Sequence, residues 1–272
     1  MDGVAKKIRW SRFLHPQSGL GVIVPIDHGL TVGPIPGLRS VSQIESWIHH
    51  PVITGIIAHK GMVERLGSRG LLQGLGVMVH LNGMTSLSAS PNRKELLTSV
   101  ERALRLGADA VSLQLNFDGT CDAANLIQLG AVVDEAQSLG VPVLTMLYDK
   151  VEALRPEQRV PRMRHLIRAC VELGTDALKI AAPAQLFQLP ELLEGVHEHT
   201  PVFFAGGEKC SDEQLLALAR EGVAAGATGL CVGRNVFQRE PGTATLDRLQ
   251  ELVVDRPGEA SPSPVVMLQA MS

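Results

Sequence analysis

Little in the composition of this chain points to a highly charged or membrane-bound partner. Its 272 residues carry a formal net charge of only −3, and no run of five or six like charges forms a basic surface for nucleic acid. No segment approaches the roughly 18 consecutive apolar residues that a membrane helix needs. These absences argue against nucleic-acid binding and against insertion into a membrane.

Cysteines and targeting signals are equally sparse. The cysteines, Cys121, Cys170, Cys210 and Cys231, lie far apart and form no CxxC pair. This spacing is typical of reduced thiols rather than of a disulfide or zinc framework. The first residues, MDGVAKKIRW, have no apolar stretch behind their basic side chains, unlike a secretory signal. We therefore expect a cytoplasmic protein.

What the chain does contain is a series of short apolar runs. They are continuous rather than alternating, as is typical of parallel strands covered on both faces. The runs are Val22–Ile26, Ile53–Ala58, Val77–Leu81, Ala110–Leu115, Val141–Leu147, Ala177–Ile180, Val202–Ala205 and Gly229–Val232. Eight such runs predict eight strands.

Stretches between the runs have helical character. Lys94–Leu106 and Glu213–Ala225 place apolar residues at helical spacing. Gly107, Gly140, Gly174 and Gly226 stand where helices would end, a position that favours glycine. The repeated unit predicts an α/β protein, a single (β/α)8 TIM barrel over residues 1–255. An open doubly wound sheet is the structural alternative, and residues 256–272 are expected to form an irregular tail.

The barrel prediction selects candidate site residues, because catalytic groups in this fold come from the carboxyl ends of the strands. Polar or glycine residues follow all eight runs. In chain order they are Asp27 and His28; His59 and Lys60; His80 and Asn82; Asn116; Tyr148; Lys179, within its run; Gly206 and Gly207; and Gly233, Arg234 and Asn235.

Lys179 is the strongest single signal among them. It interrupts an apolar run, where a charge is costly to bury without a partner. Burial and nearby cations lower a lysine's pKa, so we expect part of Lys179 to be a neutral amine able to attack a carbonyl. The alternative is a lysine that pairs with an acid or extends to the barrel rim. Lys60 is a rival amine, better explained as a rim or substrate-binding residue.

Two further residues could move protons near Lys179. Tyr148 is the only tyrosine of the chain and ends the preceding strand, about 4.8 Å away across the sheet. It could transfer the proton that breaking or forming a C–C bond requires. Asp27 could accept a proton from the lysine or from a carbinolamine hydroxyl. The alternatives are a hydrogen-bonded core tyrosine and a helix-capping or loop acid.

The last two strands end in a possible phosphate site. Gly206, Gly207 and Gly233 would leave backbone N–H groups uncovered, and Arg234 adds a guanidinium. Barrels frequently bind phosphate between the loops that follow these strands. Two tight turns are the alternative.

A zinc site is the main chemical alternative to a reactive lysine. His28, His59 and His80 follow three successive strands and could converge. No HxH or HExxH spacing supports them, so we predict no metal.

Several segments together resemble the archaeal-type class I aldolases, the family related to deoxyribose-phosphate aldolase and to archaeal fructose-bisphosphate aldolases. The resemblance runs from about Gly21 to Val254. Its segments are Val24–Gly29, His59–Gly61, His80–Thr85, Gly107–Ser112, Ala205–Gly207 and Gly233–Gln238. Within the family, the His59 and His80 segments are most similar to synthases of 2-amino-3,7-dideoxy-D-threo-hept-6-ulosonate and related aminoheptulosonate phosphates.

This resemblance implies specific roles. Lys179 would form the Schiff base without any other cofactor, Tyr148 would be the acid/base and Asp27 its partner. The phosphate ligands would be Gly206, Gly207, Gly233 and Arg234. Substrates would be a phosphorylated ketose and an aldehyde such as L-aspartate semialdehyde, whose amino-acid end needs polar partners. For substrate binding we expect His28, His59, Lys60, His80, Asn82 and Asn116. The family also implies a homo-oligomer, often a decamer.

Two segments depart from the family pattern. Asp149-Lys150-Val151 replaces the usual Pro-Arg-Gly after the tyrosine, and Ile180–Ala184 replaces a polar, tyrosine-containing segment after the lysine. Both lie on the rim that meets the substrate. A class I fructose-1,6-bisphosphate aldolase and a non-catalytic sugar-phosphate-binding barrel therefore stay open as alternatives. A related subgroup that performs acyl transfer lacks the tyrosine, so Tyr148 argues against it.

Overall fold

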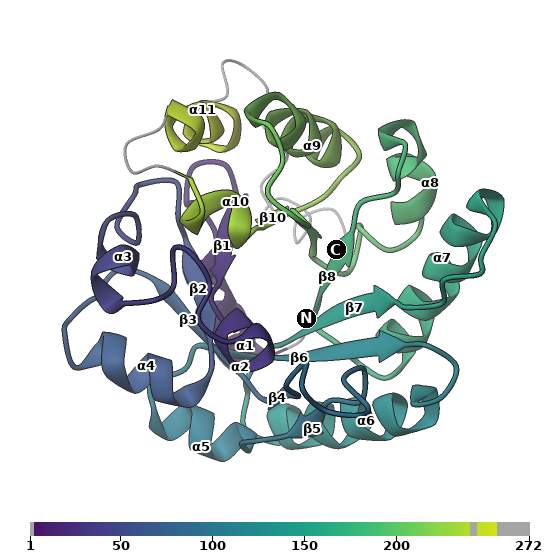
Figure 1. Ribbon diagram of the computed structural model, residues 1–272, viewed down its shortest axis with the longest axis horizontal. Helices are drawn as coiled ribbons and strands as arrows, with labels where there is room; N and C mark the ends of the chain where they lie inside the picture. Colours follow the sequence, from purple (N-terminus) through teal and green to yellow (C-terminus); the bar gives the residue numbers. More distant parts are fainter. Residues whose placement is uncertain (1–2, 240–243, 255–272) are drawn as a thin grey trace, which may run out of the picture.

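The computed structural model describes residues 3–239 and 244–254. Eight parallel strands close into a barrel surrounded by helices (Figure 1). The barrel strands are β1 (Gly21–Pro25), β2 (Gly55–Ala58), β3 (Gly76–His80), β6 (Ala110–Phe117), β7 (Val143–Asp149), β8 (Ala177–Ala181), β9 (Val202–Ala205) and β10 (Gly229–Cys231). Each overlaps one of the eight apolar runs. The TIM-barrel prediction is confirmed, and the open sheet is excluded.

The helices fill the connections between these strands. They are α1 (Val4–Trp10), α2 (His28–Val32), α3 (Val41–Glu45), α4 (Lys60–Gly67), α5 (Val100–Arg105), α6 (Asp122–Ser138), α7 (Pro156–Glu172), α8 (Leu189–Leu193), α9 (Asp212–Ala224), α10 (Arg234–Phe237) and α11 (Ala244–Val253). Short 3-10 turns are η1 (Ser11–Phe13) and η2 (Leu186–Gln188). Among the described residues, no helix has both the length and the apolar character needed to cross a bilayer.

One predicted helix is shorter than expected. Helix α5 begins at Val100, because Ser99 caps it by accepting a hydrogen bond from the amide of Arg102. The residues before it, Glu95–Leu96, form β5, which pairs with β4 (Asn82–Gly83). The helix predicted from the spacing of Leu96 and Leu97 is therefore wrong at this end, because both side chains are exposed at the small hairpin. The expected tail, residues 256–272, lies outside the described residues.

Alternation along the strands separates two cores. Outward side chains such as Val22, Val24 and Leu178 pack against the helices. Inward side chains fill the barrel itself and include Ile23, Ile57, Met78, Leu144, Met146, Phe203 and Cys231. Lys179 pairs in register with Met146 and Phe203. It therefore shares the inward face with both, so the position that broke the apolar run points into the barrel.

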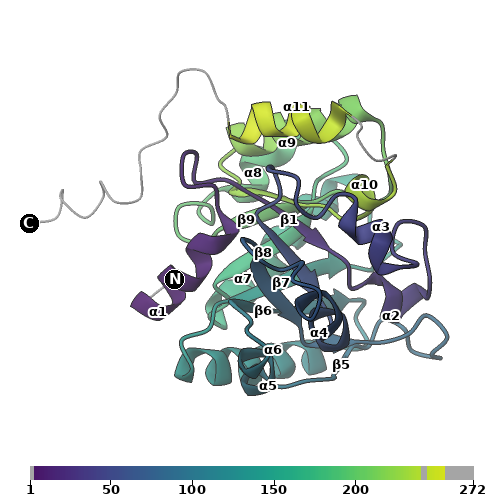
Figure 2. The ribbon, with the colours of Figure 1, turned by 90° about the vertical axis from the view of Figure 1, so that its left-hand side faces the viewer.

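An aromatic plug closes the amino-terminal end of the barrel. Trp10 and Phe13 join the inner core, with their ring centroids 5.5 Å apart. Phe13 lies so close to Gly55 and Gly76 that a Cβ at either glycine would lie 2.6 Å from its ring. Figure 2 shows α1 at this end of the barrel, whereas α2 and α10 lie at the opposite end. Solvent therefore meets the inner face only at the opposite, carboxyl end of the strands.

A repeated hydrogen bond fixes the strand starts. In four places, a side chain just before one strand accepts a hydrogen bond from a backbone N–H at the start of the adjacent strand. The pairs are Thr54 with Val22, Asp109 with Val77, Asp176 with Val143 and Thr228 with Val202. The preceding turns contain the predicted left-handed glycines, with φ of +85° at Gly107 and +90° at Gly174. The lower half of the barrel is thus held firmly beneath the site.

Candidate functional site

A cavity of about 270 Å³ opens at the carboxyl end of the barrel. Lys179 and Tyr148 line it from β8 and β7, and Arg234 lines it from the start of α10. Gly206, Gly207, Gly233, His28 and Cys231 complete the polar and small parts of its wall. Residues predicted from separate strands are thus brought to one space.

Lys179 lies at the base of this space with few partners. Its residue is 5% exposed, and its Nζ donates to the Sδ of Met146 at 3.7 Å. Within the described residues, Lys179 forms no ion pair within 4.0 Å. The structural alternative of a direct salt bridge between Lys179 and an acid does not fit the geometry of the described residues. The sulfur of Met146 is a weak acceptor, so any compensation for the burial of an ammonium must come from charges farther away.

The protonation of Lys179 differs from the sequence prediction. Burial alone lowers its pKa, but Cys231, Tyr148 and Asp27 outweigh burial and raise the pKa above the ordinary value for lysine. Burial raises the pKa of the Cys231 thiol to about 11, so at neutral pH Asp27 is the anion that holds the proton on Lys179. The raised pKa is opposite in direction to the lowering that burial alone predicts, and it favours the ammonium form of Lys179. An ammonium must lose a proton before it can attack a carbonyl.

Asp27 lies among three histidines at the start of α2. Burial alone would raise its pKa, but His80, His28, Lys179 and His59 lower it to about 2. The Nε2 of His80 is 3.9 Å from its carboxylate, and the Nδ1 of His28 is 3.7 Å away. Burial lowers the pKa of His80 to about 3, so His80 is neutral at physiological pH. Lys179 is consequently the cation that faces the ionised Asp27.

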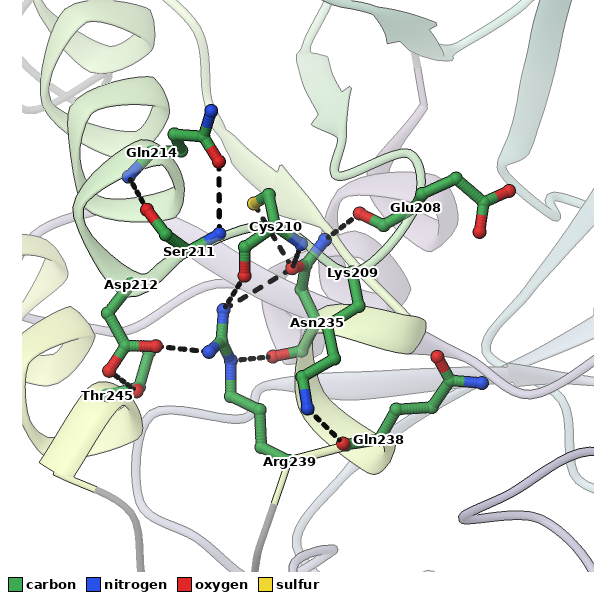
Figure 3. Close-up of polar contacts among 10 residues, drawn as sticks. All are labelled: Glu208, Lys209, Cys210, Ser211, Asp212, Gln214, Asn235, Gln238, Arg239 and Thr245. Carbon is green, nitrogen blue, oxygen red and sulfur yellow. Dashed lines mark hydrogen bonds and ion pairs between the residues drawn. The ribbon is translucent and has the colours of Figure 1, made fainter.

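Asn235 organises the glycine loop after β9 (Figure 3). Its buried amide donates to the carbonyls of Gly206 at 2.9 Å and Glu208 at 3.0 Å and accepts from the amide of Cys210 at 3.0 Å. Arg239 clamps the same loop by donating to the carbonyl of Asn235 at 2.7 Å. Gly207 has φ of +64°, which glycine adopts readily. The loop is thus held in one shape with its glycines toward the cavity.

Within the part of the chain that the structure describes, three buried polar atoms of the site accept or donate no hydrogen bond. They are the Oδ1 of Asp27, the Nδ1 of His28 and the Nε of Arg234. Arg234 also forms an ion pair with Glu208, whose side chain is exposed. Buried polar groups are nearly always hydrogen-bonded in folded proteins. These three atoms therefore indicate where a polar ligand would bind.

Several predicted site residues do not line this cavity: Asp27, His59, Lys60, His80, Asn82 and Asn116. Asn116 is buried and bonds to the carbonyl of Asn92 and to Gln114. Asn82 exchanges hydrogen bonds with the backbone of Gln114. Lys60 is exposed and donates to the carbonyl of Leu97 at 2.7 Å. Each of these last three side chains supports a neighbouring segment at the rim.

The histidines also occupy distinct places. His28 lines the cavity and packs edge-on against Phe237, with centroids 5.3 Å apart. His80 is 2% exposed and bonds through Nδ1 to the hydroxyl of Ser112 at 2.8 Å. His59 bonds to the carbonyl of His80 at 3.2 Å. Within residues 3–239 and 244–254, no three His, Cys, Asp or Glu side chains are placed to hold a metal ion.

Two residues near the site were missed by the sequence reasoning. Cys231 lines the cavity, but a lone cysteine in an apolar run gives no functional signal. Lys94 is 6% exposed, and its Nζ donates to the carbonyl of Met84 at 3.3 Å. Burial lowers its pKa, and the positive charge of Lys94 also lowers the pKa of His59 and His80. Its place in an apparently helical stretch concealed it.

A buried lysine on the inner face of a barrel, beside a tyrosine and a glycine-rich loop, is the arrangement expected of one class of enzyme, the Schiff-base or class I aldolases. Comparison with protein families matches residues 21–239 to the family described as DeoC/LacD family aldolase. The chain belongs to this family and is an enzyme of the class I aldolase type. The resemblance drawn from the sequence is confirmed.

Curated relatives of known activity span nearly the whole chain. A 2-amino-3,7-dideoxy-D-threo-hept-6-ulosonate synthase from Archaeoglobus fulgidus is 32% identical, over 87% of this chain and 86% of its own. A 2-amino-4,5-dihydroxy-6-oxo-7-(phosphonooxy)heptanoate synthase from Streptomyces griseus is 29% identical, over 92% and 90%. A class 1 fructose-bisphosphate aldolase from Halobacterium salinarum is 26% identical, over 88% and 92%.

A solved structure supports the fold independently. The crystal structure of an archaeal fructose 1,6-bisphosphate aldolase superposes with a TM-score of 0.79 and 24% identity, covering 92% of this chain and all of that one. At this identity the likeness establishes the barrel architecture.

Proposed function

We propose that this enzyme joins a fragment from a ketose phosphate or dihydroxyacetone phosphate to an aldehyde such as L-aspartate semialdehyde, through a Schiff base on Lys179. One observation carries the proposal. A single cavity of about 270 Å³ holds a buried amine, a phenol and a phosphate-sized group of glycines with Arg234. These are the parts that a covalent reaction on a phosphorylated carbonyl compound needs.

The phosphate would bind over β9 and β10. The loop held by Asn235 presents Gly206 and Gly207, and Gly233 adds a third position without a side chain. The unpartnered Nε of Arg234 supplies a charged donor. A Cβ at Gly233 would lie 2.7 Å from the carbonyl oxygen of Pro25, so glycine is required there. With the phosphate fixed, the substrate carbonyl can lie over Lys179 on the adjacent β8.

The chemistry begins when the Lys179 ammonium loses its proton to water, and Asp27 then shuttles protons at the carbinolamine stage. The amine adds to the carbonyl carbon to form a carbinolamine, whose hydroxyl leaves as water after protonation, giving an iminium. With dihydroxyacetone phosphate, Tyr148 removes a proton from the carbon next to the iminium, which gives an enamine. With a ketose phosphate, Tyr148 instead removes the proton of the β-hydroxyl, the Cα–Cβ bond breaks, and the aldehyde fragment leaves as the enamine forms. The enamine carbon attacks the aldehyde carbon, and Tyr148 returns its proton to the new alkoxide. Water then hydrolyses the iminium and restores Lys179.

The relatives support a biosynthetic role. Two of them are synthases of seven-carbon amino-keto compounds by name, which favours the same product class here. We propose that the enzyme serves the formation of aromatic amino acids or aminohydroxybenzoate-type metabolites and acts as a homo-oligomer.

Donor and acceptor assays test the proposal directly. Purified enzyme is incubated with dihydroxyacetone phosphate or fructose 1,6-bisphosphate as donor and L-aspartate semialdehyde as acceptor, with and without EDTA, and products are identified by mass spectrometry. We expect an amino-keto phosphate that forms equally in EDTA. Loss of product in EDTA would contradict the Schiff-base account. Cleavage of fructose 1,6-bisphosphate without added aldehyde would instead support the glycolytic alternative.

A non-catalytic barrel is distinguished by a separate result. Such a protein would bind sugar phosphate at Arg234, but borohydride would trap no adduct. The unpartnered Nε of Arg234 fits either protein, so the trapping of a donor on Lys179 is the result that distinguishes them.

A further inference from the structure

A second cavity, of about 520 Å³, adjoins the lysine cavity. It lies between α7 and the segment that follows β8, and it shares Tyr148, Ala181 and Ala182 with the cavity that holds Lys179. Figure 1 shows α7 and α8 side by side outside β7 and β8. Its volume lies within the range of about 300–1,000 Å³ that is usual for small-molecule sites. The two spaces meet where the reacting carbon would be.

The wall of this second cavity is largely apolar. Val160 and Met163 from α7 and Leu192 from α8 face Ala182, Pro183 and Ala184 from the loop. Val160 is 5% exposed and Leu192 2% exposed, so the inner wall is packed and preformed.

The charged groups beside this cavity are already engaged. Asp149 accepts from the Nε of Arg162 at 3.1 Å and from the amide of Val151 at 3.2 Å. Arg159 donates to backbone carbonyls at 3.4 Å. Glu157, which also lines the cavity, pairs with Arg155 at 3.3 Å. The surface that remains for a ligand therefore combines the apolar side chains with the amides of Gln185 and Gln188.

The strand order gives this cavity a place in the reaction. Around the barrel, β10, β9, β8 and β7 are consecutive neighbours. In the proposed complex, the phosphate lies over β9 and β10, and the imine is on Lys179 of β8. The new C–C bond would then form on the side of Tyr148, on β7. Adjacent strands are about 4.8 Å apart, so the acceptor carbon falls one strand beyond the lysine. From there its chain leads into the second cavity.

In the opposite direction, the polar side chains predicted to bind an acceptor are already hydrogen-bonded within the protein. Over β1–β3, His80 is bonded to Ser112 and His59 to the carbonyl of His80. Asn82, Asn116 and Lys60 are bonded to neighbouring segments. An acceptor bound there would have to displace these hydrogen bonds.

We propose that the cavity between α7 and the segment after β8 is the acceptor subsite, and that it takes aldehydes with an unbranched apolar chain of several carbons. This inference rests on the proposed Schiff-base function and goes beyond it, since it adds longer apolar aldehydes to the short, polar acceptors of the type of L-aspartate semialdehyde. Burying one methylene changes affinity by about fourfold. We therefore expect kcat/KM to rise about fourfold per methylene from propanal to hexanal, with dihydroxyacetone phosphate as donor.

Two volume-conserving variants test the wall. Met163→Gln and Val160→Thr add polarity where the chain would lie, so the rise per methylene should fall below about twofold. Met163 and Val160 do not line the lysine cavity, so trapping of the donor on Lys179 by borohydride should be unchanged. Ile127→Gln on α6 is the matched control, because Ile127 is exposed and far from both cavities. An equal rate for all aldehydes in the wild type, or an unaltered slope in both variants, would overturn the subsite.

A binding measurement keeps the subsite separate from the chemistry. Tyr148 is the only tyrosine and lines both cavities, so 3-fluorotyrosine gives one 19F resonance there. We expect 1-hexanol to shift this resonance saturably, and Met163→Gln to weaken its binding by threefold or more. A hexanol shift without any borohydride adduct would retain the subsite and refute the proposed function. No shift, together with dissociation of an oligomer by Met163→Gln, would assign this surface to subunit contact and refute the subsite.

Discussion

Replacing Lys179 by methionine separates a catalytic lysine from a structural one. Methionine is close in volume and apolar, and the position is 5% exposed with Met146 as its hydrogen-bond partner. Replacing buried ions together with their partners by hydrophobic residues of similar volume is often neutral or stabilising by about 1–4 kcal/mol, and within the described residues Lys179 has no ion-pair partner within 4.0 Å that the substitution would leave behind. A lysine that completed a buried salt bridge would instead destabilise by about 3–5 kcal/mol on removal.

The loss of Lys179 also leaves Asp27 without a nearby cation, which offsets part of the gain in the free energy of unfolding. We therefore expect Lys179→Met to unfold at the wild-type temperature or a few degrees above it, since about 1 kcal/mol moves Tm by roughly 2–4 °C in a domain of this size. Turnover should fall to the background rate because no amine remains to form the iminium.

The assay is a pair of measurements on the same preparation: calorimetric unfolding and product formation with dihydroxyacetone phosphate and an aldehyde. Lys60→Met, at an exposed rim residue, is the control and should retain both properties. A Lys179→Met protein that unfolds 10 °C or more below the wild type would show that the lysine is structural. Retained turnover would refute its role in catalysis.

Three other predictions concern the neighbours of Lys179. Donor trapping by borohydride should rise about tenfold per pH unit between pH 6 and 9, because the raised pKa of Lys179 leaves little free amine below that pKa. The Asp27→Asn variant lacks an anion that raises this pKa, so its rise in trapping should occur at lower pH. An unshifted profile would contradict the role of Asp27 in raising the pKa of Lys179. Tyr148→Phe should lower kcat by about 10²–10⁴-fold while trapping persists; unchanged kcat in steady-state assays would exclude Tyr148 as the acid/base. Arg234→Met should raise KM for dihydroxyacetone phosphate about 10–100-fold and leave dihydroxyacetone unaffected; equal effects on both donors would place the phosphate elsewhere.

The barrel could be predicted from sequence because its physical signals are local. Buried parallel strands need continuous apolar runs, and left-handed turns such as those at Gly107 and Gly174 need glycine. The shortened α5 could not be predicted, because Leu96 and Leu97 have helical spacing yet belong to a hairpin fixed by long-range pairing of Glu95 with Gly83. The aromatic plug of Trp10 and Phe13 was likewise invisible, since it depends on distant glycines.

The sequence was enough to predict which residues converge on the site, but not whether they are charged. The strand-end rule placed Lys179, Tyr148, Arg234 and the glycines correctly around one cavity. The same rule selected Asn116, which lies outside the cavity lining because Asn92 and Gln114 bind its amide. The protonation of Lys179 depends on how burial balances nearby acidic groups, which only the folded arrangement reveals.

Borohydride reduction in the presence of dihydroxyacetone phosphate, followed by peptide mass mapping, tests the central claim most directly. We predict one reduced adduct, on the peptide that contains Lys179, at a yield that depends on the donor. An adduct on Lys60 or Lys94 instead, or none at any pH between 6 and 9, would contradict the account.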